Sequence, residues 1–185
     1  MADAGWGLWG SWEETESFIG KPVGISRGAD AIELGGIRRW LEPKEFDCSL
    51  HYDAAAAQAA GFKDIVAPAT MAFTAGLAPS WSPGDPAALP GEPGKQIDLP
   101  VIFSVPAPCN LSFATSVEIE FFEPMYVGDH ITCTSILASV FRKQLKVGDG
   151  AFLRQEDTYT NQRGERVALA NLDIFRFVAP SEDQA

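Results

Sequence analysis

Two histidines, His51 and His130, are the residues of this chain best able to move a proton at neutral pH, because the ordinary pKa of histidine lies close to 7. His51 stands just ahead of an alanine-rich segment, and Asp47, four residues earlier, could orient its imidazole ring or hold a water molecule. His130 follows a glycine–aspartate pair at the expected start of a strand, so we expect an exposed or edge position for it. His51 and Asp47 therefore suggest general acid–base chemistry. The structural alternatives are a ring bonded to a nearby backbone carbonyl group and a solvated turn aspartate.

The three cysteines, Cys48, Cys109 and Cys133, cannot all pair with one another, and none lies in a C-x-x-C pair. The sequence therefore predicts a reducing compartment and no zinc or other metal site. Cys48 adjoins the His51 region, but no second base is evident beside it. We expect a packed thiol there rather than a nucleophile.

Composition and charge argue against several partners. The 185 residues are 46% hydrophobic and 21% charged, as in a folded domain, and carry a net charge of −11. A nucleic-acid partner is not expected, because phosphate binding needs a concentrated basic face. No apolar run approaches the roughly 20 residues of a membrane span, and the N-terminus lacks the features of a secretory signal. We therefore expect a soluble cytoplasmic protein with no membrane partner.

Three helical segments are expected in the first half of the chain. Apolar residues at helical spacing over residues 30–42 predict a helix that Pro43 ends. Residues 53–61 begin with an aspartate suited to an N-cap and finish with a glycine suited to a helix end, so a short alanine-rich helix is predicted. A further helix is expected over residues 68–77, because proline is tolerated in its first turn.

The C-terminal part of the chain predicts strands. Residues 116–122 alternate apolar residues with glutamates, as in a half-buried strand. Three further strands are expected at residues 131–140, 151–160 and 167–178, separated by tight glycine-containing turns. Four such strands predict an antiparallel meander, and with the preceding helices an α+β domain whose sheet covers a helix on one face.

The remaining segments extend this single domain, which we expect to comprise residues 1–185. An N-terminal extension carries Trp6, Trp9 and Trp12 at a spacing of three, which on a helix would form one aromatic stripe with nearby glutamates facing water. We expect it to pack over the domain or over a neighbouring subunit. Residues 79–100 are rich in proline and glycine and predict a long irregular loop of functional use.

Several short segments, in a fixed order, resemble the MaoC-like acyl dehydratases of hot-dog fold, and more closely their N-terminal, fatty-acid-synthase-type dehydratase region. The resemblance spans roughly residues 18–178. It implies a curved antiparallel sheet wrapped around a central helix, dimers of hot-dog units with active sites between units, and coenzyme A thioesters as ligands. The segments that carry it are residues 36–40, 50–53, 61–62, 65–70, 119–124, 127–129, 158–161 and 163–164.

The resemblance also assigns site residues. The family motif is a glycine–aspartate pair, one free position, then asparagine, proline, an apolar residue and histidine, whose aspartate and histidine hold the water that adds to or leaves a 2-enoyl thioester. His51 matches the histidine, whereas Phe46 matches the aspartate, and Asp47 stands one position later. The family receives the thioester oxyanion on a backbone N–H near the start of the second helix. That position corresponds to Ala69 and Thr70, at an expected helix start that favours negative charge.

Two functions are favoured over a third, a non-enzymatic acyl-CoA sensor, for which the sequence shows no appended output domain. The first is an enoyl-CoA hydratase or 3-hydroxyacyl-CoA dehydratase, a hydro-lyase with His51 as acid and base and Asp47 as its partner. The second is a non-catalytic acyl-CoA-binding subunit, paired with another hot-dog subunit that carries the full motif. Either would act as a homodimer, a higher multiple or a heteromer, without a cofactor beyond the coenzyme A of its substrate. In this acidic chain the CoA phosphates would have to meet a local basic pair, Arg38–Arg39 or Arg142–Lys143, unless these residues form surface salt bridges only.

Overall fold

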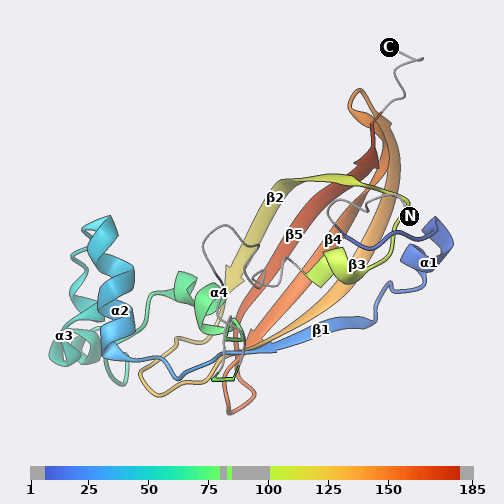
Figure 1. Ribbon diagram of the computed structural model, residues 1–185. Helices are drawn as coiled ribbons and strands as arrows, with labels where there is room; N and C mark the ends of the chain where they lie inside the picture. The colour runs from blue at the N-terminus through green and yellow to red at the C-terminus, as the bar shows by residue number, and fades with distance from the viewer. Residues whose placement is uncertain (1–6, 80–82, 85–100, 180–185) are drawn as a thin grey trace.

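The computed structural model describes residues 7–79, 83–84 and 101–179, in which a curved five-stranded antiparallel sheet carries short helices (Figure 1). The α+β class is therefore as predicted. The strands are β1 (Pro22–Arg27), β2 (Leu111–Phe121), β3 (Thr132–Leu145), β4 (Gly148–Thr160) and β5 (Arg166–Val178). The helices are α1 (Trp12–Glu16), α2 (Leu34–Leu41), α3 (Ala54–Ala59) and α4 (Ala72–Ala75), with 3-10 turns η1 (Glu42–Lys44), η2 (Ser49–His51), η3 (Ala69–Met71) and η4 (Val101–Ser104).

The strands lie in the order β1–β3–β4–β5–β2, and each neighbouring pair is antiparallel. β3, β4 and β5 form a meander, as predicted. The prediction was wrong for β2, which lies beside β5 instead of β3 and forms an edge. β1, which no alternating pattern indicates, forms the other edge. An alternating pattern identifies a strand and its buried face but not its neighbours, and β1 is short and contains Pro22 and Gly24.

The inner face of the sheet carries the core in two clusters. The first joins β3, β4 and β5 to α2, η3 and α4, and the second joins the same strands to η4. Buried polar side chains lie between them: the Asp157 carboxylate accepts hydrogen bonds from Ser135 Oγ at 2.5 Å and from Gln155 Nε2 at 2.8 Å. Gln155 in turn accepts from the Ile102 N–H at 2.8 Å, which ties η4 to the sheet.

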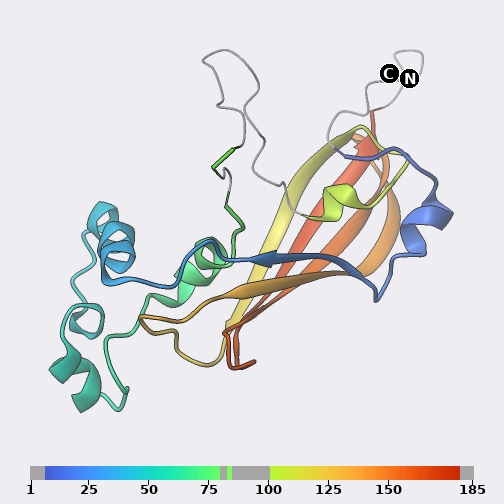
Figure 2. The same ribbon diagram turned by 60° about the horizontal axis from the view of Figure 1, so that its bottom comes forward.

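The helix that the sheet covers is α4, with η3 before it, and not the alanine-rich helix as predicted. α3 forms as expected, because the Asp53 carboxylate caps it by accepting from the Ala55 N–H at 2.8 Å. However, α3 packs beside η2 and lies away from the strands (Figure 2). Alanine methyl groups offer little apolar surface to bury. The η3–α4 segment buries Met71 and Ala72, and the Phe73 ring lies 5.2 Å from that of Tyr159 on β4.

The N-terminal extension is tied by backbone bonds to η4 and the segment after it and to β3, and Trp9 and Trp12 do not share one helix. α1 begins only at Trp12, after a capping box at Ser11, whereas Trp9 pairs with Ala107 in a parallel bridge; Trp6 lies outside the described residues. The glutamates of α1 face water, as expected. Of the predicted loop at residues 79–100, only 79 and 83–84 belong to the described part. No helix in the described ranges is long and apolar enough to span a bilayer.

Candidate active site

His51 lies at the end of η2, and its ring is half-buried. Its Nδ1 lies 2.6 Å from the carbonyl oxygen of Val66. A carbonyl oxygen only accepts, so Nδ1 carries a proton, and the lone pair of the corresponding neutral tautomer lies on Nε2. The carbonyl bond considered as the structural alternative is thus present. It also fixes the tautomer and orientation that a proton-transferring histidine needs.

The neighbour of His51 is Phe46 and not Asp47. The Phe46 ring centroid lies 5.8 Å from that of His51, and the Phe46 carbonyl group accepts a hydrogen bond from Tyr52 Oη at 2.8 Å. Asp47 is exposed, and in the described part of the chain no hydrogen bond or ion pair joins it to His51. The position that matches the family's aspartate therefore does face His51, but it carries a phenyl ring.

An ion pair between a buried carboxylate and an exposed arginine supports the backbone that holds His51. Val66 forms an antiparallel bridge with Tyr126, whose N–H donates to Asp129 Oδ2 at 2.9 Å. Asp129 is buried, and Arg163 Nη1 donates to its Oδ1 at 2.8 Å. Burial alone would raise the pKa of Asp129, but the hydrogen bonds from Arg163 and from the Tyr126 N–H outweigh it and lower that pKa. The sequence predicts a turn at Asp129 and another at Arg163 but not the ion pair between them, because a pairing between distant loops leaves no local signal.

Ala69 and Thr70 begin η3, and both are exposed. They follow Val66, whose carbonyl group holds the His51 ring, by only three and four residues. The candidate oxyanion N–H groups therefore lie on the same short stretch of backbone that positions His51. The first N–H groups of a helical turn have no partner inside it. The structure thus brings His51, Ala69 and Thr70 into one region and leaves Asp47 outside hydrogen-bond contact.

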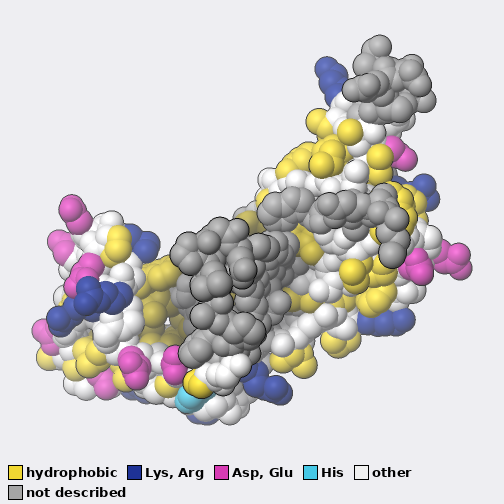
Figure 3. All heavy atoms as spheres, viewed as in Figure 1, with side chains coloured by type: hydrophobic (Ala, Val, Ile, Leu, Met, Phe, Trp, Pro, Cys, Tyr) yellow, Lys and Arg dark blue, Asp and Glu magenta, His cyan; other side chains and the backbone are white. Residues whose placement is uncertain are grey.

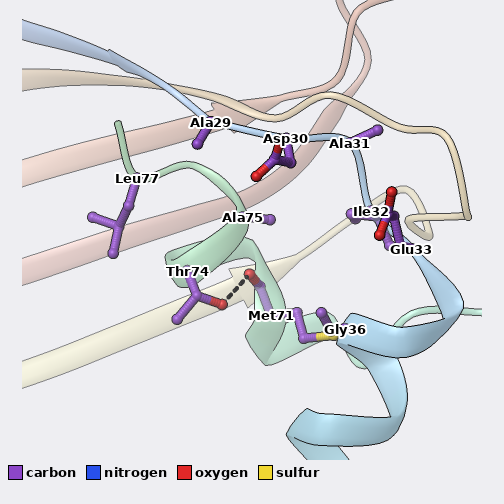
Figure 4. A pocket seen from close by; sticks show the side chains of 10 residues that line it. All are labelled: Ala29, Asp30, Ala31, Ile32, Glu33, Gly36, Met71, Thr74, Ala75 and Leu77. Carbon is purple, nitrogen blue, oxygen red and sulfur yellow. Dashed lines mark hydrogen bonds between the residues drawn. The ribbon is translucent and has the colours of Figure 1, made fainter. Parts of the chain in front are cut away.

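A pocket of about 300 Å³ opens beside η3 and α4, the elements that follow Val66 in the chain (Figure 4). We call it the α4 pocket, because α4 and η3 form one wall. The loop after β1 and the first turn of α2 form the other wall. Its lining residues are Ala29, Asp30, Ala31, Ile32, Glu33, Gly36, Met71, Thr74, Ala75 and Leu77.

The two basic pairs lie on different parts of the molecule. Arg38 and Arg39 are exposed on α2, where Arg39 Nη1 pairs with Glu42 at 3.2 Å. Arg142 and Lys143 lie near the far end of β3, and the Arg142 guanidinium lies 5.4 Å from the Trp12 ring centroid. Figure 3 shows basic and acidic side chains intermixed over α2 and α3, with no continuous basic surface on that face.

The other reactive residue types form no second site within the described ranges. His130 is exposed, as expected, and its N–H donates to Gln162. The three cysteines are free, and burial raises the pKa of both Cys109 and Cys133 to about 11, so neither forms a thiolate readily. No group of histidine, cysteine and carboxylate side chains suited to a metal occurs among the described residues.

Residues 17–170 match the family described as the FAS1-like dehydratase domain region. The chain belongs to this family. This dehydratase-region chain is also 30% identical over 174 residues to the "Probable enoyl-CoA hydratase alpha subunit" of Thermomonospora curvata, an alignment that covers 91% of the chain and 52% of that protein. It therefore spans about half the length of that curated relative.

Solved structures place the dehydratase-region chain in the MaoC-like hot-dog fold, as predicted. The ChsH1–ChsH2 complex of Mycobacterium tuberculosis is similar with a TM-score of 0.65 and 21% identity, covering 92% of this chain and 90% of that one. The MaoC-like dehydratase of Rhodospirillum rubrum follows with a TM-score of 0.54 and 21% identity, covering 85% and 93%. At such identities the likeness concerns the fold alone, and function must be argued from the site.

Proposed function

We propose that this chain is the acyl-CoA-binding subunit of an enoyl-CoA hydratase or 3-hydroxyacyl-CoA dehydratase, and that a second hot-dog subunit supplies the catalytic aspartate and histidine. The observation that carries this proposal is the phenyl ring of Phe46 beside His51, in the place where the family has its aspartate. Asp47, the carboxylate one position later, is exposed, and in the described part of the chain it makes no hydrogen bond to His51.

The chemistry explains why the missing carboxylate matters. Hydration adds a hydroxyl group to the β-carbon of the enoyl thioester and a proton to its α-carbon, and dehydration reverses both transfers. Water must be oriented and deprotonated while the α-carbon receives a proton, so two polar groups share the work. A phenyl ring accepts no comparable hydrogen bond. His51 alone therefore supplies only half of the required pair.

The partner in this proposal joins along β2. Val117, Ile119 and Phe121 project from this edge strand on the inner side of the sheet and are all exposed. An edge strand with unpaired backbone groups and apolar side chains invites pairing with another chain. A relative named as an alpha subunit and a similar fold solved as a two-protein complex support a heteromer.

In the assembled enzyme, the N–H groups of Ala69 and Thr70 would receive the thioester oxyanion. Arg38 on α2 pairs with no carboxylate among the described residues, whereas Arg39 is paired with Glu42, so Arg38 is the better placed of the two for a CoA phosphate. The reaction needs no cofactor beyond the coenzyme A of the substrate. Three free cysteines fit action in the cytoplasm.

A second candidate is catalysis by His51 within this chain. The observation that favours it is the hydrogen bond from Nδ1 to the Val66 carbonyl group, which leaves Nε2 free to take up and release a proton. In that case the water would be oriented by a group other than Asp47, such as a residue from the neighbouring subunit.

Absorbance of a panel of enoyl-CoA thioesters separates the two candidates. We expect the purified chain to be inactive alone and active when combined with a hot-dog subunit that carries the intact motif. In that complex, His51→Ala should leave turnover within about twofold, whereas alanine at the partner's catalytic histidine should abolish it. Turnover by the chain alone that falls by about 10² to 10⁴ in His51→Ala would instead establish His51 as the acid and base.

A further inference from the structure

The edge strand β2 carries charge on its outer side, opposite the apolar residues of its inner side. β2 pairs with β5 and forms one edge of the sheet (Figure 1). After the bulge between Ala114 and Ser116, its side chains alternate regularly, so that Glu118 and Glu120 both project on the outer side, and both are exposed. The edge therefore offers a partner strand apolar groups on one side of the sheet and carboxylates on the other.

The two glutamates keep their charge free for a partner. In the described part of the chain neither forms a hydrogen bond or an ion pair. Arg154, on the same side of the sheet, donates to both carboxylate oxygens of Asp173, at 2.8 and 2.7 Å, and Arg166 lies over an aromatic ring beyond the end of β2. Glu156, in the same row across the strands as Glu118, adds a further negative charge to this side.

A second copy of this chain would meet this edge at a disadvantage. Residues that face each other across an antiparallel pair project on the same side of the sheet, with their Cβ atoms about 5 Å apart. When residues 116–121 of two copies pair about a two-fold axis, a glutamate comes directly or diagonally opposite a glutamate. Like charges in these positions weaken the pairing, whereas a lysine or arginine there strengthens it.

From these observations we infer that β2 selects a partner whose edge strand alternates apolar residues with lysine or arginine, in preference to a second copy of this chain. This inference rests on the proposed function, in which the catalytic subunit joins along β2. It adds the chemistry that distinguishes this subunit from a copy: positive charge on the outer side of the joint sheet. Specificity of this kind is a difference between two affinities, and it can be measured as one.

A charge-reversed copy of this chain supplies a partner of the required chemistry. The double substitution Glu118→Lys and Glu120→Lys, here the basic-edge variant, keeps the apolar side of β2, and both positions are exposed, so the fold should be unaffected. Sedimentation velocity of fluorescently labelled wild type, titrated with either unlabelled protein, gives both dissociation constants. We expect the constant for the mixed dimer to be about tenfold or more below that for the wild type with itself.

A matched control separates the edge from the net charge. The double substitution Glu13→Lys and Glu16→Lys changes the net charge equally, but on α1, which contacts β3 and is separated from β2 by two strands. This control should bind the wild type about as weakly as the wild type binds itself. Raising sodium chloride from about 0.05 M to about 0.5 M should weaken the mixed dimer and strengthen self-association, because salt screens attraction and repulsion alike.

The position of the contact has its own control. Val117→Lys in the wild-type member should abolish the mixed dimer, because it places a charge on the apolar side of β2. A mixed dimer that survives this change would lie away from β2 and would overturn the inference.

The remaining outcomes are distinct. If the wild type binds itself as tightly as it binds the basic-edge variant, or if the α1 control binds as tightly as that variant, β2 does not select by charge and the inference is overturned. The proposed function would then stand, because enoyl-CoA turnover tests it separately. If the wild type hydrates enoyl-CoA by itself while the mixed dimer forms as expected, the proposed function fails and selection at β2 is still supported.

Discussion

A histidine whose Nδ1–H is held by a carbonyl group has one nitrogen left for chemistry, and what that nitrogen can do depends on its neighbours. At His51 the neighbouring ring belongs to Phe46, which provides apolar contact but no acceptor. The site therefore has a well-oriented imidazole without the carboxylate that would complete a proton-transfer pair. This arrangement suits a subunit that holds an acyl thioester more than one that hydrates it alone.

The ion pair that supports the Val66 backbone gives a prediction in pH. Arg163 and the Tyr126 N–H lower the pKa of Asp129, so its charge stabilises the fold above the ordinary aspartate pKa, and this stability is lost as the pH falls below about 4. We expect Asp129→Asn to lower the free energy of unfolding by about 2 kcal/mol at neutral pH. In urea titrations, the difference from wild type should shrink as the pH falls toward 3.

Asp47→Asn is the matched control, because Asp47 is exposed and its side chain makes no hydrogen bond or ion pair with the described residues. It should unfold like the wild type at each pH. An Asp129→Asn protein with a constant deficit at all pH values would show that the loss comes from packing rather than from charge.

How far the sequence predicts this site depends on whether the signal is local. The position of His51 before a capped alanine-rich helix could be predicted, because capping and composition are local. Which of the two side chains, Phe46 or Asp47, faces His51 could not be predicted, because this depends on the backbone path between η1 and η2. The Asp129–Arg163 pair joins loops far apart in sequence, so no pattern within either loop announces it.

At the scale of elements, close packing between β1 and α4 positions the pocket and the segment before it. Gly28, just after β1, lies against the backbone of Ala75, and a Cβ there would overlap the Ala75 carbonyl oxygen. The Gly28 N–H donates to the Ile131 carbonyl at 2.9 Å, so the loop cannot easily move away. This contact explains why residue 28 is a glycine.

We therefore expect Gly28→Ala to destabilise the protein by about 2 kcal/mol or more, since rigid backbone must shift to admit one methyl group. Gly35→Ala should do the opposite and stabilise it by roughly 0.5 to 1 kcal/mol, because that position is helical and its Cβ meets only solvent. Thermal unfolding measures whether each variant is less or more stable than the wild type. A Gly28→Ala protein as stable as the wild type would mean that β1 and α4 are held less rigidly than the contact implies.

The packing of the elements also explains why the prediction chose the wrong helix as the one that the sheet covers. Residues 53–61 have better helical signals than residues 69–75, with an aspartate cap and almost only alanine. Helix propensity, however, does not decide which helix a sheet covers; buried apolar surface does. Met71 and Phe73 supply that surface on η3 and α4, and the alanines of α3 do not.

For the whole molecule, the two sheet edges differ in their suitability for a partner. β1 is short, begins at Pro22 and has an irregular register after it, features that protect an edge from further pairing. β2 is eleven residues long and places exposed apolar side chains on its inner side and glutamates on the other. The acidic chain, with a net charge of −11, repels copies of itself, so such an edge must contribute apolar contact to any assembly.

The last prediction compares one exposed apolar residue on each edge. Val117 on β2 and Ile25 on β1 are 58% and 60% exposed, so lysine at either position should leave the fold intact. We expect the purified wild type to sediment as a dimer or to form a heteromer with its partner subunit, and Val117→Lys to shift either assembly to the 19.9 kDa monomer, because an edge lysine opposes strand pairing. Ile25→Lys should assemble like the wild type. Sedimentation velocity at micromolar concentration measures all three proteins, and dissociation by Ile25→Lys but not by Val117→Lys would place the partner on β1 instead.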